Sequence, residues 1–401
     1  MGFISIFGTF RNYFSQLDIS LAQYGSYLYL QILIAALIPA VILGCLKIRV
    51  RFYGVIVSFV MILLLVWLTG AGMKFFTVFF LSEIALIFLY QFIRRKTKNK
   101  YIYFLFLFLS MSPLLISKFS GMFTGSVVGF LGLSYLNFKT IQIIIEIYDG
   151  SIKKVNLFNL VYFLSFFPTL SSGPIDRYNR FENEIKSKIP VKNYAGDYLA
   201  NGIRKIIMGI GYKFVMAYLI NQYWLTAVPP DKSLLSVISY MYAYSFYLFF
   251  DFAGYSNFAI GTSYILAVKT PENFNMPFAS KDMKEFWTRW HISLSRWFGD
   301  YIYSRIVLNA LRNKWVKSKH TAGYAAQIIT MFIMGLWHGP QVFYILYGFY
   351  QGVLLVGTDY FQRKMPFHRK HKNKPWYEII SVISTFNLVC FGFLIFSGYL
   401  F

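Results

Sequence analysis

The sequence predicts an all-α polytopic membrane protein with about eleven or twelve hydrophobic helical segments, some of them amphipathic or re-entrant. Only 14% of the 401 residues are charged, whereas about a quarter of the residues in a soluble domain carry a charge. Hydrophobic residues make up 57% of the chain, and many lie in runs of roughly twenty, the length that a helix needs to cross a bilayer. We therefore expect a multi-pass protein of the cell membrane.

The apolar runs follow one another without an internal repeat or a low-complexity linker, so we expect one domain over residues 1–401. The clear runs are Tyr27–Leu46, Tyr53–Leu68, Phe75–Ile93, Tyr101–Ile116 and Ile379–Phe401. The weaker or shorter runs are Val127–Ile147, Leu157–Leu170, Ile203–Trp224, Leu234–Phe250, Tyr255–Val268, Tyr324–Trp337 and Val342–Tyr360.

The formal net charge is +23, but Lys and Arg are concentrated in short loops between apolar runs, such as Lys47–Arg51, Arg94–Lys100 and Arg363–Lys374. The positive-inside rule explains this pattern. Because no nucleic-acid-binding module is visible, we predict no nucleic-acid partner. We expect the basic loops on the cytoplasmic side, where they favour anionic membrane lipid or an acidic protein.

The topology is less regular in the middle of the chain. Simple alternation of spans would place the basic stretch Arg177–Lys192 outside the cell, against the positive-inside rule. One apolar segment between Tyr101 and Leu170 is therefore expected not to span. The segment Leu157–Leu170 is short enough to be re-entrant.

The stretch Leu234–Val268 is too long for one span and carries Asp251 near its middle, in FFDFAGYSNFAIG. An ionisable residue at that depth faces protein or water, not lipid. Asp251 is therefore either a packing residue, bonded to a neighbouring helix, or part of a polar site. The sequence leaves both roles open.

The stretch EFWTRWHISLSRWFGDYIY, Glu285–Tyr303, is predicted to form one amphipathic helix that lies along an interface or lines a cavity. Ser280 or Asp282 is expected to be the N-cap, and Glu285 in the first turn completes a capping-box-like pattern for Asp282. His291 falls on the aromatic face rather than with the charged residues. A lone histidine in that position is compatible with either packing or function.

A second histidine in an apolar run favours a functional role over packing. His338 lies well inside the apolar run Met331–Tyr350, preceded by Trp337 and followed by Gly339 and Pro340. A polar group at membrane depth without a partner costs several kcal/mol, and a proline disturbs the helix just after it. We therefore expect His338 to border a cavity and to be functional. Two histidines without nearby cysteines or paired carboxylates predict no metal site.

Several ordered motifs together resemble the membrane-bound O-acyltransferase family. FWTRWH is followed by GLWHG, and FFDFAGYSNFAIG, PENFN and SSGPIDRY strengthen the match, which covers most of the chain. Within the family, the chain is most similar to the branch that transfers D-alanine in Gram-positive bacteria. The nearest alternative is the alginate O-acetyltransferase branch, but its members tend to continue with a PLGGNR-like loop where this chain has SRIVLNALRNKW.

The resemblance implies a ring of spanning helices around a buried tunnel, with His338 and His291 at the active site. It implies that D-alanine comes from the phosphopantetheine thioester of a small acidic carrier protein. The D-alanyl group then passes through the membrane toward lipoteichoic acid, with other proteins of the same D-alanylation pathway. A thioester is already activated, so no permanently bound cofactor is expected, and a histidine would serve as the base. The candidate substrate-binding residues are Asp251, Asn273, Asn275, Trp287, Arg289, Trp290 and Trp337.

The segment Ser304–His320 is the expected docking site for the carrier protein, because basic residues there accompany an apolar pair. The predicted docking residues are Arg305, Ile306, Val307, Arg312, Lys314 and Lys317. From another functional class, a lipid or polysaccharide transporter is the alternative. Transporters often show internal repeats and paired broken helices, and neither is visible in this sequence.

Overall fold

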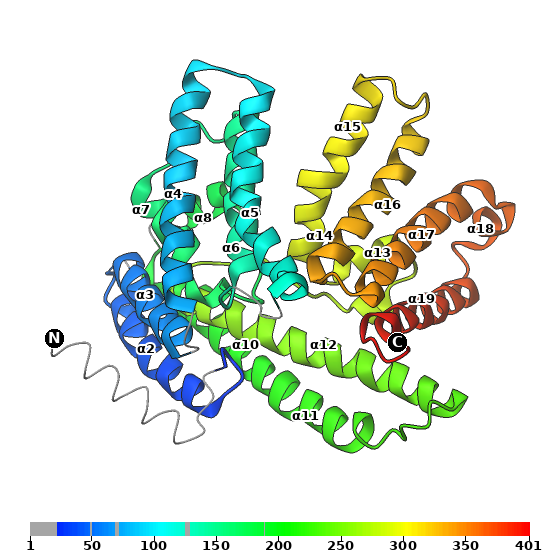
Figure 1. Ribbon diagram of the computed structural model, residues 1–401. Helices are drawn as coiled ribbons and strands as arrows, with labels where there is room; N and C mark the ends of the chain where they lie inside the picture. Colours follow the sequence, from blue (N-terminus) through cyan, green and yellow to red (C-terminus); the bar gives the residue numbers. More distant parts are fainter. Residues whose placement is uncertain (1–21, 49, 69–71, 125–128, 188) are drawn as a thin grey trace. The chain divides into compact units, whose positions relative to one another are not determined.

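The computed structural model describes residues 22–48, 50–68, 72–124, 129–187 and 189–401. Within these ranges every regular element is a helix (Figure 1), which confirms the all-α prediction. Among the described helices, those long and apolar enough to span a membrane are Tyr27–Cys45, Gly72–Lys96, Lys100–Gly121 and Pro375–Phe396, and Arg51–Val66 is a shorter apolar helix.

The chain forms two compact units, and α10 (Asn201–Ile210) and α12 (Leu234–Ile265) each contribute to both. The first unit consists of Met1–Ser120, Thr124–Ile207 and Asn257–Thr270. The second unit consists of Gly121–Phe123, Met208–Ser256 and Pro271–Phe401.

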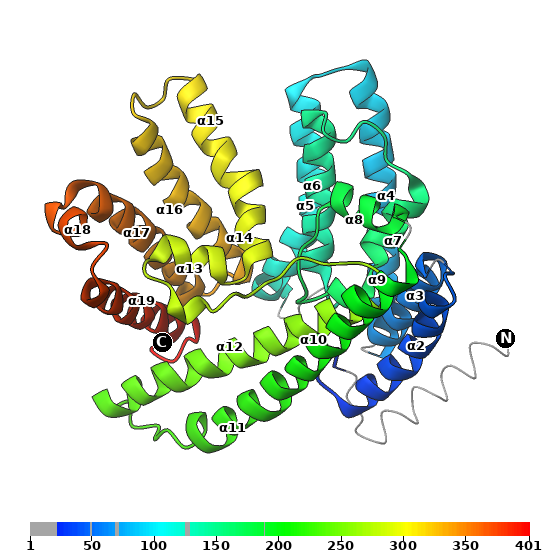
Figure 2. The same cartoon turned by 180° about the vertical axis from the view of Figure 1, so that it is seen from behind.

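The first unit is built around α4, α5 and α6, which lie side by side in both views (Figures 1 and 2). Buried polar groups connect these helices: Ser110 donates to Glu83 at 2.7 Å, and the hydroxyls of Ser110 and Thr140 are 3.2 Å apart. The helices of this unit are α2 (Tyr27–Cys45), α3 (Arg51–Leu68), α4 (Gly72–Lys96), α5 (Lys100–Thr124), α6 (Leu133–Asp149), α7 (Leu157–Ser165), α8 (Tyr178–Lys186), α9 (Val191–Asn193) and η2 (Tyr194–Ala200).

The SSGPIDRY motif forms a buried polar junction between α6 and α8. Asp176 is 2% exposed and forms an ion pair with Arg180 one turn later in α8. Gln142 of α6 donates from its side chain to the backbone carbonyl of Asp176 at 2.8 Å, and Arg177 donates to Gln142 at 3.0 Å. Buried polar groups need such partners, so this motif connects α8 to α6.

The second unit contains the C-terminal helices. Its α15 and α16 run side by side as a hairpin in both views (Figures 1 and 2). Beyond them, α16 packs against α17 and α17 against α19. The elements are η3 (Gly211–Ala217), α11 (Tyr218–Ile220), η4 (Asn221–Leu225), η5 (Pro277–Ala279), α13 (Met283–Arg289), α14 (Ile292–Phe298), η6 (Gly299–Tyr303), α15 (Ser304–Arg312), α16 (Lys319–His338), α17 (Val342–Lys364), α18 (Pro366–His371) and α19 (Pro375–Phe396).

Two expected segment boundaries are wrong. Residues predicted as separate spans on either side of Asp251 form one 32-residue helix, α12. Within it, Gly254 and Gly261 allow close packing against Lys213 and Gly202. The run Leu157–Leu170 is divided at Phe166 into α7 and the 3-10 turn η1 (Phe167–Thr169).

Candidate active site

His338 is the last residue of α16, where this helix gives way to the turn before α17. Gly339 ends the helix with extended backbone (φ 167°, ψ 170°). The centroids of the rings of Phe396, Tyr344 and Trp337 lie 4.8, 5.8 and 4.6 Å from that of the imidazole. The imidazole is half-buried, so His338 is enclosed by aromatic rings but remains accessible.

Glycines allow α16 and α17 to approach closely beside His338. A Cβ atom on Gly335 would lie 2.4 Å from the carbonyl oxygen of Tyr344, and one on Gly348 would lie 2.4 Å from that of Met331. Real Cβ atoms do not come so near a backbone oxygen. The glycine before the histidine therefore fixes the helix contact that positions His338.

His291 lies at a break between two short helices, which corrects the predicted continuous helix. The structure has α13 up to Arg289 and α14 from Ile292, and Trp290 is extended. His291 itself is left-handed (φ 42°, ψ 52°), a conformation that few residues other than glycine adopt. Asp282 caps α13 as predicted, accepting from the backbone N–H groups two and three residues later.

The PENFN segment holds this break in place. The N–H of Ile292 donates to the carbonyl of Asn273 at 2.9 Å, and the hydroxyl of Ser293 donates to the side-chain oxygen of Asn273 at 2.6 Å. Asn273 is fully buried and donates from its amide to Ser256 at 3.1 Å. Asn275 uses its backbone N–H, which donates to the carbonyl of Arg289 at 2.9 Å. Asn273 is thus a positioning residue for the His291 backbone.

The two histidines lie within electrostatic reach of each other in the second unit. His291 is 5% exposed and lies outside the helices that are long and apolar enough to span. Burial, with a smaller contribution from the nearby His338, lowers the pKa of His291 to about 3. His291 is therefore neutral at physiological pH and can donate one hydrogen bond and accept another.

The other predicted substrate-binding residues have varied surroundings. Trp290 is buried with its ring centroid 4.7 Å from that of Phe393, and Arg289 pairs with Glu285 at 2.6 Å. Asp251 forms an ion pair with Lys213, so a packing role explains its position in α12.

The remaining two tryptophans have polar or catalytic neighbours. Trp287 donates from its indole to the side chain of Gln351 at 3.3 Å, and Trp337 is half-buried beside His338. Among the described residues, no three His, Cys, Asp or Glu side chains are grouped to hold a metal ion.

A cavity of about 430 Å³ lies between α13–α14 and α16, with Trp287 in its wall. Two polar atoms of the lining, the side-chain oxygens of Gln327 and Thr330, are buried and have no hydrogen-bond partner among the described residues. Sequence reasoning missed both residues. Their spacing from His338 was the available signal, because Gln327, Thr330, Met334 and His338 follow at three- and four-residue steps and share one helix face.

The predicted docking residues lie on α15 and the turn that follows it. Arg312, Lys314 and Lys317 are exposed, and Arg305 is half-buried. Ile306 and Val307 are also half-buried, whereas Leu308 and Trp315 are 64% and 70% exposed. The most exposed apolar side chains of the segment are thus Leu308, directly after the predicted pair, and Trp315, in the turn after α15.

Comparison with known proteins places the chain in a family. Residues 52–401 match the model of MBOAT, the membrane-bound O-acyltransferase family. A teichoic acid D-alanyltransferase of Bacillus subtilis (strain 168) is 39% identical over 392 residues, covering 94% of this chain and 98% of that protein. One from Streptococcus thermophilus is 38% identical, covering 95% of this chain and 96% of that protein.

More distant similarity extends to another branch. A probable alginate O-acetylase of Pseudomonas syringae pv. tomato is 31% identical over 280 residues, covering 67% of this chain and 49% of that protein. The predicted resemblance is therefore confirmed. The chain belongs to the membrane-bound O-acyltransferase family and is a membrane acyltransferase.

Proposed function

We propose that this acyltransferase moves D-alanine from a carrier-protein thioester across the membrane toward lipoteichoic acid. The observation that carries the proposal is the similarity, over 94% or more of the chain, to proteins named teichoic acid D-alanyltransferases. The alginate O-acetylase named above covers less of the chain at lower identity, which favours the D-alanyl donor over an acetyl donor.

The donor is the phosphopantetheine thioester of an acidic carrier protein. The exposed cations of α15 and its turn support this partner, because positive charge steers an acidic protein to the surface. The exposed side chains of Leu308 and Trp315 provide apolar area for the contact. The complex thus combines charge attraction with burial of apolar surface.

The cavity beside α16 is the proposed path of the pantetheine arm. From Gln327 to His338 the helix rises roughly 16 Å, at about 1.5 Å per residue, and the cavity lining follows it from Gln327 to Met334. The arm contains amide N–H groups, which are the donors that the oxygens of Gln327 and Thr330 require. Its binding would therefore satisfy these buried acceptors and carry the thioester toward His338.

The chemistry then follows from the two histidines. His338 takes the proton of the acceptor hydroxyl while the oxygen of that hydroxyl attacks the carbonyl carbon of the thioester. The C–S bond breaks, the new ester forms, and the thiolate of the arm takes up the proton from His338. Neutral His291 donates a hydrogen bond to the carbonyl oxygen as negative charge develops there.

A transfer assay with two donors tests this proposal. Membranes from cells that lack their own copy are supplied with this protein and with carrier loaded with either D-[14C]alanine or [14C]acetate. We expect D-alanyl label in the teichoic acid fraction at a level at least tenfold above acetyl label. Preferential transfer of acetate, or equal transfer from a D-alanyl thioester of free pantetheine, would contradict the proposed donor.

A further inference from the structure

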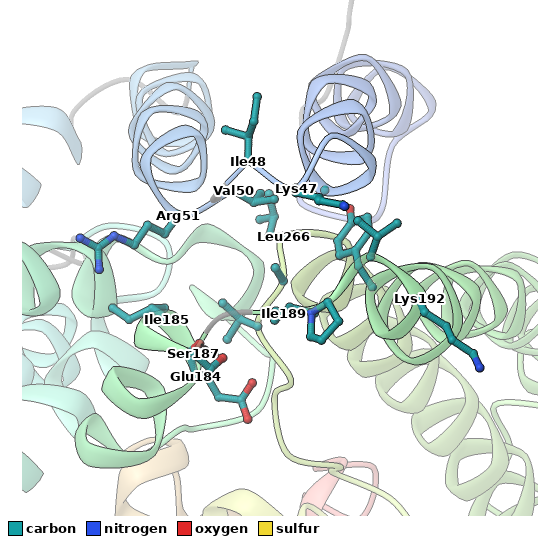
Figure 3. Close-up of a pocket in the computed structure, with 16 residues that line it drawn as sticks. Lys47, Ile48, Val50, Arg51, Glu184, Ile185, Ser187, Ile189, Lys192 and Leu266 are labelled. Atoms are coloured by element: carbon teal, nitrogen blue, oxygen red, sulfur yellow. Dashed lines mark hydrogen bonds between the residues drawn. The ribbon is translucent and has the colours of Figure 1, made fainter.

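A second cavity, of about 720 Å³, lies within the first unit and is not used by the proposed reaction. It is bounded by the end of α2, the loop from Lys47 to the start of α3, the end of α8 and the residues that follow α12. Figure 3 shows Ile185, Ile189 and Leu266 around its middle, with the basic side chains of Lys47 and Lys192 at its edge. The cavity is thus apolar inside and cationic at the rim.

The carboxylate in the lining does not neutralise these cations. The Glu184 carboxylate forms an ion pair with Arg180 at 3.8 Å. It also accepts hydrogen bonds from the hydroxyl of Tyr198 at 3.4 Å and from the backbone N–H of Lys269 at 3.3 Å. Lys47 and Lys192, by contrast, make no ion pair with any described residue. The rim therefore carries uncompensated positive charge.

Arg51 adds a buried hydrogen-bond donor to the same lining. Its guanidinium carbon lies 4.9 Å from the ring centroid of Phe52 and 5.2 Å from that of Phe158. Its Nε is buried and has no hydrogen-bond partner among the described residues. Figure 3 shows Arg51 on the opposite side of the cavity from Lys192, so Arg51 adds positive charge to the lining without sharing one ligand atom with Lys192.

We propose that this cavity binds an anionic phospholipid, with the phosphate headgroup at the rim formed by Lys47 and Lys192 and the start of an acyl chain against the apolar lining. The positive-inside rule places the loop at the cytoplasmic surface, where anionic lipids attract basic residues. The neighbouring side chains of Leu46 and Ile48 are 62% and 52% exposed, which suits a site that opens to lipid. A free phosphate ion would bind the cationic rim but leave the apolar lining without a contact. A phospholipid matches both features, because its headgroup is anionic and its acyl chains are apolar.

Lipid titration of the purified protein tests this site. In neutral detergent micelles, phosphatidylglycerol is added at increasing mole fraction and the melting temperature is recorded; phosphatidylcholine and glycerol 3-phosphate serve as parallel additives. We expect phosphatidylglycerol alone to raise the melting temperature of the wild type. The Lys47→Gln/Lys192→Gln double variant should need about tenfold more of it or more, since each basic residue contributes about 1 kcal/mol.

The matched control is the Lys153→Gln/Lys154→Gln double variant, which removes the same charge from exposed positions outside the cavity. It should respond to phosphatidylglycerol like the wild type. If the control variant also needs more phosphatidylglycerol to reach the same melting temperature, the effect comes from general surface charge. If glycerol 3-phosphate raises the melting temperature as much as phosphatidylglycerol does, the site binds free phosphate. Either result overturns the proposal.

Photo-cross-linking of the wild type tests the same site without variants, so misfolding of a variant cannot affect the result. A photoactivatable phosphatidylglycerol is cross-linked to the protein in nanodiscs, and the labelled peptides are mapped by mass spectrometry. We expect labels in the segments 44–51 and 184–194. Labelling that avoids both segments would contradict the lipid site.

Discussion

At the scale of single residues, the site depends on backbone positions that the sequence does not reveal. The histidines were identifiable from their apolar surroundings, and the pattern around His338 also indicated the helix end beside it. The left-handed conformation of His291 was not predictable, because helix periodicity continues through the residue and no glycine marks the break. The hydrogen bonds that Asn273 accepts from Ile292 and Ser293 hold that conformation. They join segments that are distant in the sequence, so a local sequence pattern does not reveal them.

Removing the side chain of Asn273 should therefore impair catalysis through His291. Asn273→Ala loses the bonds to Ser293 and Ser256, each worth about 1 kcal/mol, and leaves buried groups unsatisfied. We expect transfer of D-alanine to fall about tenfold to a hundredfold with the protein still present in the membrane. Asn275→Ala is the matched control, since Asn275 contacts Arg289 through its backbone; an equal loss in both variants would refute the positioning role.

The lowered pKa of His291 predicts a pH dependence of stability. The unfolded chain binds a proton at His291 below about pH 6.5, whereas the folded protein, with a pKa of about 3, does not. This residue therefore stabilises the fold fully above pH 6.5, and the contribution is lost as the pH falls toward 3. Between pH 7 and pH 5 the loss is about 2 kcal/mol.

Comparison with His291→Asn isolates this contribution, because asparagine accepts the left-handed conformation and does not titrate. Melting temperatures of the two proteins in detergent at pH 7 and pH 5 are compared. The wild type should lose more stability on acidification than the variant. Parallel losses would show that His291 is not a buried neutral imidazole.

At the scale of elements, apolar runs predicted most helices but not their interruptions. The cap at Asp282 and the ion pair of Glu285 with Arg289 were predictable because both are local. The break after α13 and the single long α12 were not, because tertiary contacts decide whether a helix continues. Gln327 and Thr330 were missed for a related reason: a cavity between two elements is visible only after they pack.

The close contact between α16 and α17 gives a prediction of its own. Gly335→Ala would place a methyl group 2.4 Å from the Tyr344 carbonyl, so the helices must separate beside His338. We expect a lowered melting temperature and a loss of activity of at least tenfold. Gly357→Ala, in α17 with no atom within 4 Å of the added carbon, should be neutral or slightly stabilising. Similar melting temperatures for the two variants would disprove the contact.

The proposed carrier-docking site extends over several residues of α15. Ile306→Asp and Leu308→Asp should each reduce binding of the acidic carrier at least tenfold, since a carboxylate repels the partner and removes apolar contact. Binding is measured by pull-down and by titration calorimetry. Leu234→Asp, at a 77% exposed position of α12, is the control for a new surface charge. Undiminished binding in both α15 variants would remove this segment as the docking site.

At the scale of the whole molecule, composition was sufficient to predict the class. Low charge and long apolar runs predicted a helical membrane protein, and the family match confirms it. The number of spans was harder to predict, because α12, α16 and α17 mix aromatic and polar residues and fall outside the clearly spanning helices. The ring of helices around a tunnel remains a prediction that rests on the family.

His338 is the proposed base for D-alanine transfer, and complementation of cells with variants of this residue tests that role. Cells without their own copy are complemented with wild type, His338→Ala or His320→Ala, an exposed histidine of the same helix, at matched protein level. D-alanine esters on lipoteichoic acid are then quantified. We predict that His338→Ala lowers esters by 10²–10⁴-fold, the usual cost of losing a general base, with carrier binding intact and His320→Ala unaffected. Near-normal esters in the His338→Ala cells would rule out His338 as the base.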